Sequence, residues 1–253
     1  MPKNPGAEWW RTYFDEQYLL EYEPIFSPER DRREVARMLD VLELGAGAKL
    51  LDVPCGHGRH AHLLAEAGFD VTGLDFSPTL LARAKARGTG SRLRYLRGDM
   101  RKLPSRWSGR FDGVLNLFTS FGFFQHPLDD AGVIGELSRV LKPGGVLLWH
   151  GASRDGVARG LVPRDWWTST DGTMFACERD FDPLSGLLTV RTTVRGRGKP
   201  VERSHQIRLY TATRLAELCA AAGLIVERAW DGWRDRPMSS RSSEMLILAR
   251  KER

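Results

Sequence analysis

Short apolar runs alternate with longer stretches of helical periodicity through the first 150 residues of the chain. Runs of four to seven residues rich in Leu, Val and Phe are typical of buried strands. Ser27-Pro28 and Ser77-Pro78 each provide an N-cap followed by a proline suited to the first turn of a helix. The alternation predicts a doubly wound α/β sheet with crossover helices. The five predicted strands are 49–53, 69–74, 93–96, 111–117 and 146–150.

This rhythm changes between residues 151 and 209. Alternating runs at 174–181, 187–194 and 201–210 are separated by two turn-rich segments, which predicts an antiparallel sheet inserted after the fifth strand. Further strands are expected at 224–229 and 244–250, joined by a polar hairpin loop, so the last of seven strands is antiparallel. We therefore expect a core of residues 1–150 and 210–253, with residues 151–209 forming a cap over a substrate.

Aromatic residues are concentrated near the N-terminus, between residues 7 and 22. Their spacing fits one amphipathic helix or two short ones. The simpler interpretation is a packing helix that covers the core. The functional interpretation is a helical lid, residues 1–44, that brings Tyr13 and Tyr22 to a ligand.

Composition narrows the class of protein. No run among the 253 residues is long and apolar enough to cross a membrane, and Met1–Pro5 lacks the apolar core of a signal peptide. Three scattered cysteines predict reduced thiols in the cytoplasm and offer no metal-ligand spacing. The net charge of +6 permits a nucleic-acid partner, but the arginines are spread along the chain, which disfavours one. The sequence leaves a homodimer open.

The most informative stretch joins the first strand to the next helix. Asp52-Val53-Pro54-Cys55-Gly56-His57-Gly58 is a glycine turn between a strand and a helix, a geometry that directs free backbone N–H groups at a ligand. Asp75 ends the second strand, where a carboxylate is placed to bind the hydroxyls of a ribose. A glycine turn alone is a weak signal, and an ordinary tight connection is the alternative.

Together, Asp-Val-Pro-Cys-Gly-His-Gly and the following Gly-Phe-Asp-Val-Thr-Gly-Leu-Asp-Phe-Ser resemble the first two motifs of class I S-adenosylmethionine (SAM)-dependent methyltransferases. Glycine N-methyltransferase-like and sugar-amine N-methyltransferase-like members are the most similar branch. Pro54 departs from the family's usual glycine and removes one N–H donor. The resemblance implies a Rossmann-like fold, SAM as cofactor, S-adenosylhomocysteine as product and no metal.

The resemblance also implies a set of cofactor contacts. Arg30 would hold the SAM carboxylate, Asp75 the ribose, Asp99 and Met100 the adenine, and Leu117 a backbone contact. The expected cofactor-binding residues are Tyr13, Tyr22, Arg30, Asp52, Pro54, Cys55, Gly56, Gly58, Asp75, Phe76, Asp99, Met100, Leu117, Phe118 and Ser120.

Candidates for the acceptor side are weaker. An amine acceptor must lose a proton, to solvent or to a base, and His150, His205 and Tyr210 are the candidate catalytic residues. Strand alternation places His205 on one face and Tyr210 on the other, so both would reach one pocket only if the strand bends. The expected substrate-binding residues are Phe121, Trp166, Trp167 and Arg208.

The sequence therefore predicts a SAM-dependent methyltransferase that acts on a nitrogen or oxygen of a small molecule. Two alternatives remain: an RNA methyltransferase, and a SAM-binding protein without catalytic activity in which Pro54 and a closed lid leave no room for an acceptor.

Overall fold

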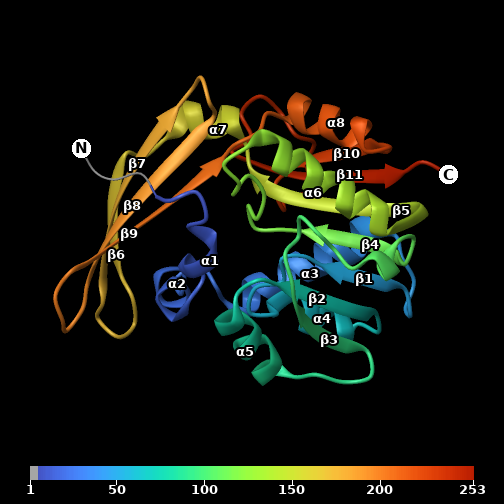
Figure 1. Cartoon of the computed structure of the whole chain (residues 1–253), viewed down its shortest axis with the longest axis horizontal. Helices are drawn as coiled ribbons and strands as arrows, with labels where there is room; N and C mark the ends of the chain where they lie inside the picture. The colour runs from blue at the N-terminus through green and yellow to red at the C-terminus, as the bar shows by residue number, and fades with distance from the viewer. Residues whose placement is uncertain (1–4) are drawn as a thin grey trace.

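Two β-sheets organise the molecule, as the computed structural model shows for residues 5–253 (Figure 1). The first sheet has seven strands in the order β10-β11-β5-β4-β1-β2-β3. All run parallel except β11, which is antiparallel to both of its neighbours, as predicted for the last strand. The strands are β1 (Lys49–Asp52), β2 (Asp70–Asp75), β3 (Leu93–Arg97), β4 (Phe111–Asn116), β5 (Leu141–Ala152), β10 (Leu224–Asp231) and β11 (Glu244–Lys251).

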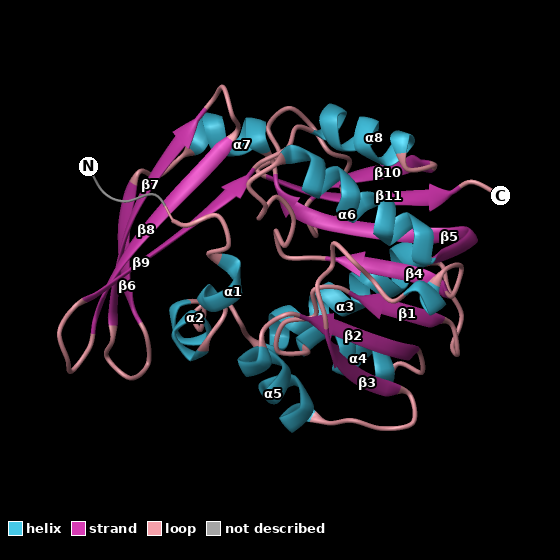
Figure 2. Ribbon diagram, in the orientation of Figure 1, coloured by secondary structure: helices cyan, strands magenta, loops and turns pink. Residues whose placement is uncertain are grey.

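Helices cover both faces of this sheet (Figure 2). On one face, Met38 and Leu64 form an apolar cluster with Leu50 of β1. On the other face, Ile134 and Leu215 belong to a cluster that contains Val114 of β4 and Ile247 of β11. These contacts bury the apolar stripe that each amphipathic helix presents. The helices are α3 (Pro28–Leu42), α4 (Arg59–Glu66) and α5 (Pro78–Arg87) on the first face, and α6 (Pro127–Val140) and α8 (Ala212–Ala221) on the second, with a short 3-10 helix at Ser105–Trp107.

The second sheet is antiparallel and has four strands, in the order β6-β7-β8-β9. The strands are β6 (Arg164–Thr168), β7 (Met174–Asp182), β8 (Leu187–Arg195) and β9 (Val201–Arg208), and α7 (Arg154–Gly160) precedes them. The sequence predicts three of these strands and misses β6 and α7. The β6 sequence Arg-Asp-Trp-Trp-Thr has no alternation of apolar and polar residues, because this edge strand has little buried surface of its own.

The N-terminal helices α1 (Trp10–Tyr13) and α2 (Glu16–Glu21) lie between the two sheets, opposite the carboxyl ends of β1 and β4 (Figure 1). Arg203 of β9 forms an ion pair with Asp15 at 2.8 Å, and Ser77 donates a hydrogen bond to the Phe14 carbonyl. We call α1 and α2 the lid, which is thus tied to both sheets, whereas α3, also within the predicted lid of residues 1–44, covers the seven-stranded sheet.

Met1–Asn4, part of the segment in which we expect no signal peptide, lie outside the described residues. Among the helices described, none combines the length and apolarity needed to cross a bilayer.

Candidate functional site

Two adjoining cavities lie under the lid, and the inner one is formed by the carboxyl ends of the parallel strands. It takes in the glycine turn after β1, the acidic end of β2 and the loop after β4, which is where open α/β sheets bind ligands. Its wall is formed by Trp10, Phe14, Tyr18, Phe26, Asp52, Pro54, Cys55, Gly56, His57, Arg59, His60, Leu74, Asp75, Phe76, Leu80, Gly98, Asp99, Met100, Leu117, Phe118, Ser120, Phe123 and Phe124.

Two buried carboxyl groups, Asp52 and Asp75, line the inner cavity. Asp75 accepts hydrogen bonds from the backbone N–H groups of Gly56 and Ser77, both at 2.8 Å, and burial nevertheless raises its pKa to about 6. Burial raises the pKa of Asp52 to about 8, with a further increase from the nearby Asp75. Buried acids of this kind favour a cationic ligand that restores their charge. The inner cavity thus fits the sulfonium and ammonium groups of SAM.

The two glycines of the turn have different roles. At Gly56 the backbone has φ of +55°, and a Cβ would meet no atom within 4 Å, so the cavity extends over this residue. At Gly58 a Cβ would lie 2.5 Å from the Tyr95 hydroxyl and 2.9 Å from Ala84. Gly58 therefore allows α4 to pack closely on its neighbours, and only Gly56 faces the ligand space.

Arg59 is a residue of the inner cavity that the sequence analysis missed. Its guanidinium forms ion pairs with Asp31 at 2.7 Å and Glu34 at 2.5 Å, and only 6% of the side chain is exposed. Its second terminal nitrogen, Nη2, has no hydrogen-bond partner among the described residues. A buried donor without a partner suits a ligand carboxylate.

Asp31, Glu34 and His60 lie close enough to resemble a metal site. His60 is 2.7 Å from the same Glu34 oxygen that Arg59 contacts, so the guanidinium already supplies the positive charge there. Hydrogen bonds from His60 and the charge of Arg59 lower the pKa of Glu34 despite its burial. We assign this cluster to holding Arg59.

The outer cavity, of about 520 Å³, lies between the lid and the four-stranded sheet. Five side chains line both cavities and form their junction: Phe14, Tyr18, Phe118, Ser120 and Phe123. The remaining wall of the outer cavity is formed by Trp9, Tyr13, Glu21, Tyr22, Pro24, Ile25, Arg30, Thr119, Ala152, Asp165, Trp167, Cys177, Arg179, Leu188, Val190, His205, Ile207, Leu209 and Glu244.

Several predicted cofactor residues lie in this outer cavity. Tyr13 and Tyr22 line it and do not reach the inner one. Arg30 also lines the outer cavity, where its Nε donates to Glu34 at 2.7 Å. Apart from these three and Gly58, all the predicted cofactor residues line the inner cavity, and their contacts with SAM stay predictions.

Among the catalytic candidates, only His205 reaches a cavity. Its ring packs against Trp9 and Tyr13, and burial, with Arg203 and Arg179 nearby, lowers its pKa to about 3. Ile207 and Leu209 line the same cavity as His205, as the alternation predicts, and Tyr210 does not.

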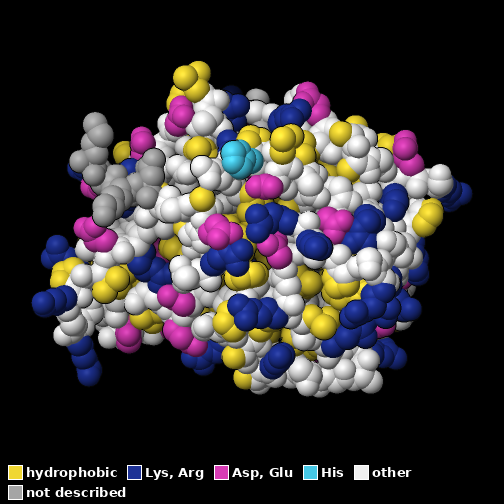
Figure 3. All heavy atoms as spheres, in the orientation of Figure 1, with side chains coloured by type: hydrophobic (Ala, Val, Ile, Leu, Met, Phe, Trp, Pro, Cys, Tyr) yellow, Lys and Arg dark blue, Asp and Glu magenta, His cyan; other side chains and the backbone are white. Residues whose placement is uncertain are grey.

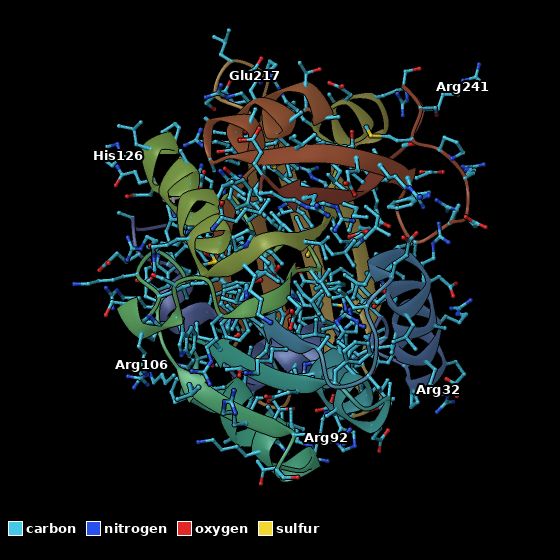
Figure 4. The ribbon with its side chains drawn as sticks, turned by 90° about the vertical axis from the view of Figure 1, so that its right-hand side faces the viewer. Arg32, Arg92, Arg106, His126, Glu217 and Arg241 are labelled. Atoms are coloured by element: carbon cyan, nitrogen blue, oxygen red, sulfur yellow. The ribbon has the colours of Figure 1, made fainter. Side chains whose placement is uncertain are left out.

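Tyr210 and His150 lie elsewhere. Tyr210 donates a hydrogen bond to buried Asp130 at 2.7 Å, in the core. His150 accepts from the Phe118 N–H through Nδ1 and packs against Trp233. Neither side chain lines either of the two cavities, and His150 reaches the outer wall only through Glu244, whose carboxylate lies 3.5 Å from its Nε2. His126, in the loop after β4, projects outward from the surface (Figure 4).

Of the four predicted substrate-binding residues, only Trp167 lines the outer cavity. Its indole donates to the Glu21 carbonyl at 2.9 Å. Trp166 points outward and is 70% exposed, because neighbouring residues of a strand point to opposite faces of the sheet and Trp167 points inward. Phe121 is buried against Trp149 and Tyr210, and Arg208 donates to the Ser185 and Gln125 carbonyls. The geometry therefore does not support Trp166, Phe121 or Arg208 as pocket residues.

Comparison with known proteins agrees with this geometry. Residues 50–145 match a methyltransferase domain. A glycine/sarcosine N-methyltransferase of Halorhodospira halochloris is 32% identical over 130 residues, 51% of this chain and 48% of that protein. A ubiquinone biosynthesis O-methyltransferase of Xanthomonas oryzae is 33% identical over 119 residues, 46% and 48% of the two chains. The chain thus spans about half the length of these two relatives.

Solved structures share the whole fold. The CcbJ methyltransferase from Streptomyces caelestis superposes with a TM-score of 0.79 at 18% identity, covering 96% of this chain and 99% of that one. CalS10, an amino pentose methyltransferase from Micromonospora echinaspora, gives a TM-score of 0.65 at 21% identity, with 94% and 98% covered. The chain therefore has a methyltransferase domain at residues 50–145 and shares the fold of these methyltransferases.

Proposed function

We propose that this enzyme transfers the methyl group of SAM to an amine nitrogen of a small molecule. The observation that carries the proposal is the junction of Phe14, Tyr18, Phe118, Ser120 and Phe123, where the inner and outer cavities meet. Methyl transfer requires donor and acceptor in line, so adjoining cavities with a shared wall provide the alignment. Aromatic faces at the junction also stabilise positive charge.

The inner cavity would hold the cofactor through groups already placed there. Asp75 would bind the ribose hydroxyls, Asp99 and Met100 the adenine, and Arg59 the carboxylate of the amino-acid tail. Asp52 would face the positive charge. When bound, SAM supplies both the reactive carbon and the leaving group, so the protein mainly positions the two reactants.

The size of the outer cavity supports a small acceptor. A volume of about 520 Å³ lies within the range of small-molecule sites and is closed on one side by β6–β9. On the face seen in Figure 3, basic side chains are interspersed with acidic and apolar ones. Recognition of RNA favours a continuous basic surface, so this distribution favours the small molecule.

Nitrogen is the favoured acceptor because His205, the imidazole of the outer cavity, is a weak base. The low pKa of His205 makes its imidazole unable to remove a proton from an alcohol, whereas an amine needs only to be uncharged in order to attack. The relationship to a glycine/sarcosine N-methyltransferase and the fold shared with an amino pentose methyltransferase support nitrogen. The relationship to an O-methyltransferase makes oxygen the alternative acceptor.

The test is to incubate the enzyme with labelled SAM and a metabolite extract, and to identify the labelled product by mass spectrometry. We expect the label on a nitrogen of a small molecule. Label on oxygen would overturn the choice of atom, and label in RNA the choice of substrate. Calorimetric SAM binding without any labelled product would favour a binding protein.

A further inference from the structure

Glu21, the last residue of α2, is a buried carboxylate that the sequence analysis did not single out. Only 2% of the residue is exposed. It accepts a hydrogen bond from the Tyr13 hydroxyl at 3.2 Å and from the Thr192 hydroxyl at 2.9 Å. The Trp167 indole donates to its backbone carbonyl and so fixes the end of α2 against β6.

No cation is paired with this carboxylate among residues 5–253. The nearby Arg203 is committed to Asp15 at 2.8 Å and to the Tyr13 carbonyl. Burial raises the pKa of Glu21 even though two hydroxyl donors and Arg203 oppose the shift. A buried carboxylate with only neutral partners is costly to keep charged, and a positive group beside it would remove that cost.

The surroundings of Glu21 determine which positive group fits. Glu21 lines the outer cavity together with the aromatic side chains of Tyr13, Tyr22 and Trp167. Aromatic faces attract cations, and a carboxylate accepts N–H hydrogen bonds. The neutral His205 on the same wall carries no positive charge. The two arginines of the wall are paired with other acids, Arg30 with Glu34 at 2.7 Å and Arg179 with Asp165 at 2.9 Å. This combination suits an alkylammonium group.

We propose that the Glu21 carboxylate binds the protonated amine of the acceptor and removes one proton from it before methyl transfer. In this step one N–H bond breaks, an O–H bond forms on Glu21, and the nitrogen keeps the electron pair with which it attacks. The two opposite charges cancel, and the carboxylic acid later returns its proton to water. The inference deepens the proposed function and rests on it, since it names the group that selects an amine.

A structural role for Glu21 is the competing explanation, because its hydrogen bond to Thr192 of β8 also ties the lid to the inserted sheet. The Glu21→Gln variant separates the two roles. Glutamine has the same shape and an oxygen that accepts from Tyr13 or Thr192, but no charge. Glu16→Gln is the matched control, because Glu16 begins the same helix and pairs with Arg83 on the surface.

Two readouts distinguish these roles. The first is the binding of cyclohexylamine and of cyclohexanol, followed through the fluorescence of Trp9 and Trp167 in the cavity wall. We expect the wild type and Glu16→Gln to bind the amine at least tenfold more tightly than the alcohol, and Glu21→Gln to bind both alike. The second is transfer to the acceptor found in the extract, which should fall at least 100-fold in Glu21→Gln while S-adenosylhomocysteine affinity stays within twofold.

A Glu21→Gln protein that keeps the amine preference would overturn the inference and leave methyl transfer intact. Failure of the wild type to methylate any extract component would instead remove the proposed function, while the amine-binding result stands by itself. If Glu21→Gln does not fold, Glu21→Asp keeps the charge and should keep a preference of at least fivefold. Equal binding of amine and alcohol by the aspartate variant and the wild type would overturn the inference.

Discussion

At the scale of single residues, the structure separates positions that the sequence presents as equivalent. Gly56 and Gly58 stand two residues apart in one motif, and both have positive φ. One faces the ligand space and the other faces Tyr95. Burial and direction, which a motif does not contain, decide which glycine contributes to binding and which to packing.

Alanine substitutions should separate these two roles. Gly58→Ala combines left-handed strain, about 1–2 kcal/mol, with overpacking against Tyr95 of about 1–3 kcal/mol, so its melting temperature should fall clearly. Gly56→Ala has the left-handed strain without the overpacking, and it places a methyl group in the cavity. Compared with Gly58→Ala, it should therefore lose less thermal stability and more SAM affinity. Thermal unfolding and calorimetry provide the two measurements. Equal losses of stability and affinity in both variants would contradict the assignment.

Asp75 provides the second test at this scale. Asp75→Asn removes a charged acceptor for the ribose and should weaken SAM binding by roughly 1.5–3 kcal/mol, which is about 10- to 150-fold. Asp112→Asn is the control, because Asp112 likewise accepts from a backbone N–H, that of Lys49, but lies outside both cavities. Isothermal calorimetry checks the result. Unchanged affinity in Asp75→Asn, or an equal loss in the control, would remove Asp75 from the site.

At the scale of elements, sequence patterns predict the parallel core well because each strand and helix of the core buries an apolar face. The sequence also predicts β7, β8 and β9 of the insertion, which alternate apolar and polar residues, and misses the edge strand β6. What the sequence could not supply was the position of the lid. Whether Tyr13, Tyr22 and Arg30 face the inner or outer cavity depends on how α1 and α2 dock, and local periodicity does not encode that packing.

The docking of the lid depends strongly on Arg203. Its guanidinium lies 4.5 Å from the centre of the Tyr13 ring and pairs with Asp15. Arg203→Ala should weaken this attachment by about 1–2 kcal/mol, discounted because Asp15 is partly exposed. We expect amide exchange in α2 to become roughly tenfold faster, and SAM to associate and dissociate faster.

Hydrogen–deuterium exchange and stopped-flow binding measure these two effects. Arg195→Ala is the control, because Arg195 is exposed at the end of β8. If exchange in α2 is unchanged, or if Arg195→Ala has the same effect, Arg203 does not hold the lid.

At the scale of the whole molecule, two buried carboxyl groups of the inner cavity make the free energy of unfolding depend on pH. Asp52 and Asp75 have pKa values of about 8 and about 6 in the folded protein, against an ordinary value of 3.8. Between about pH 4 and pH 8 the folded chain therefore binds more protons than the unfolded chain. The free energy of unfolding from these two groups must fall as the pH rises through this range.

A cationic ligand should favour the ionised form of both carboxyl groups. Its affinity should therefore rise over the pH range in which the stability of the free protein falls. SAM affinity should increase between pH 6 and pH 8 more steeply than that of S-adenosylhomocysteine, which lacks the sulfonium charge. Asp52→Asn should flatten both the stability curve and the difference between the ligands, because it cannot release the proton. Melting temperatures and calorimetry across this range check the prediction. An equal change in stability from pH 6 to pH 8 in the wild type and in Asp52→Asn would mean that Asp52 is already ionised in the free enzyme, and that the negative charge is present before the cofactor arrives.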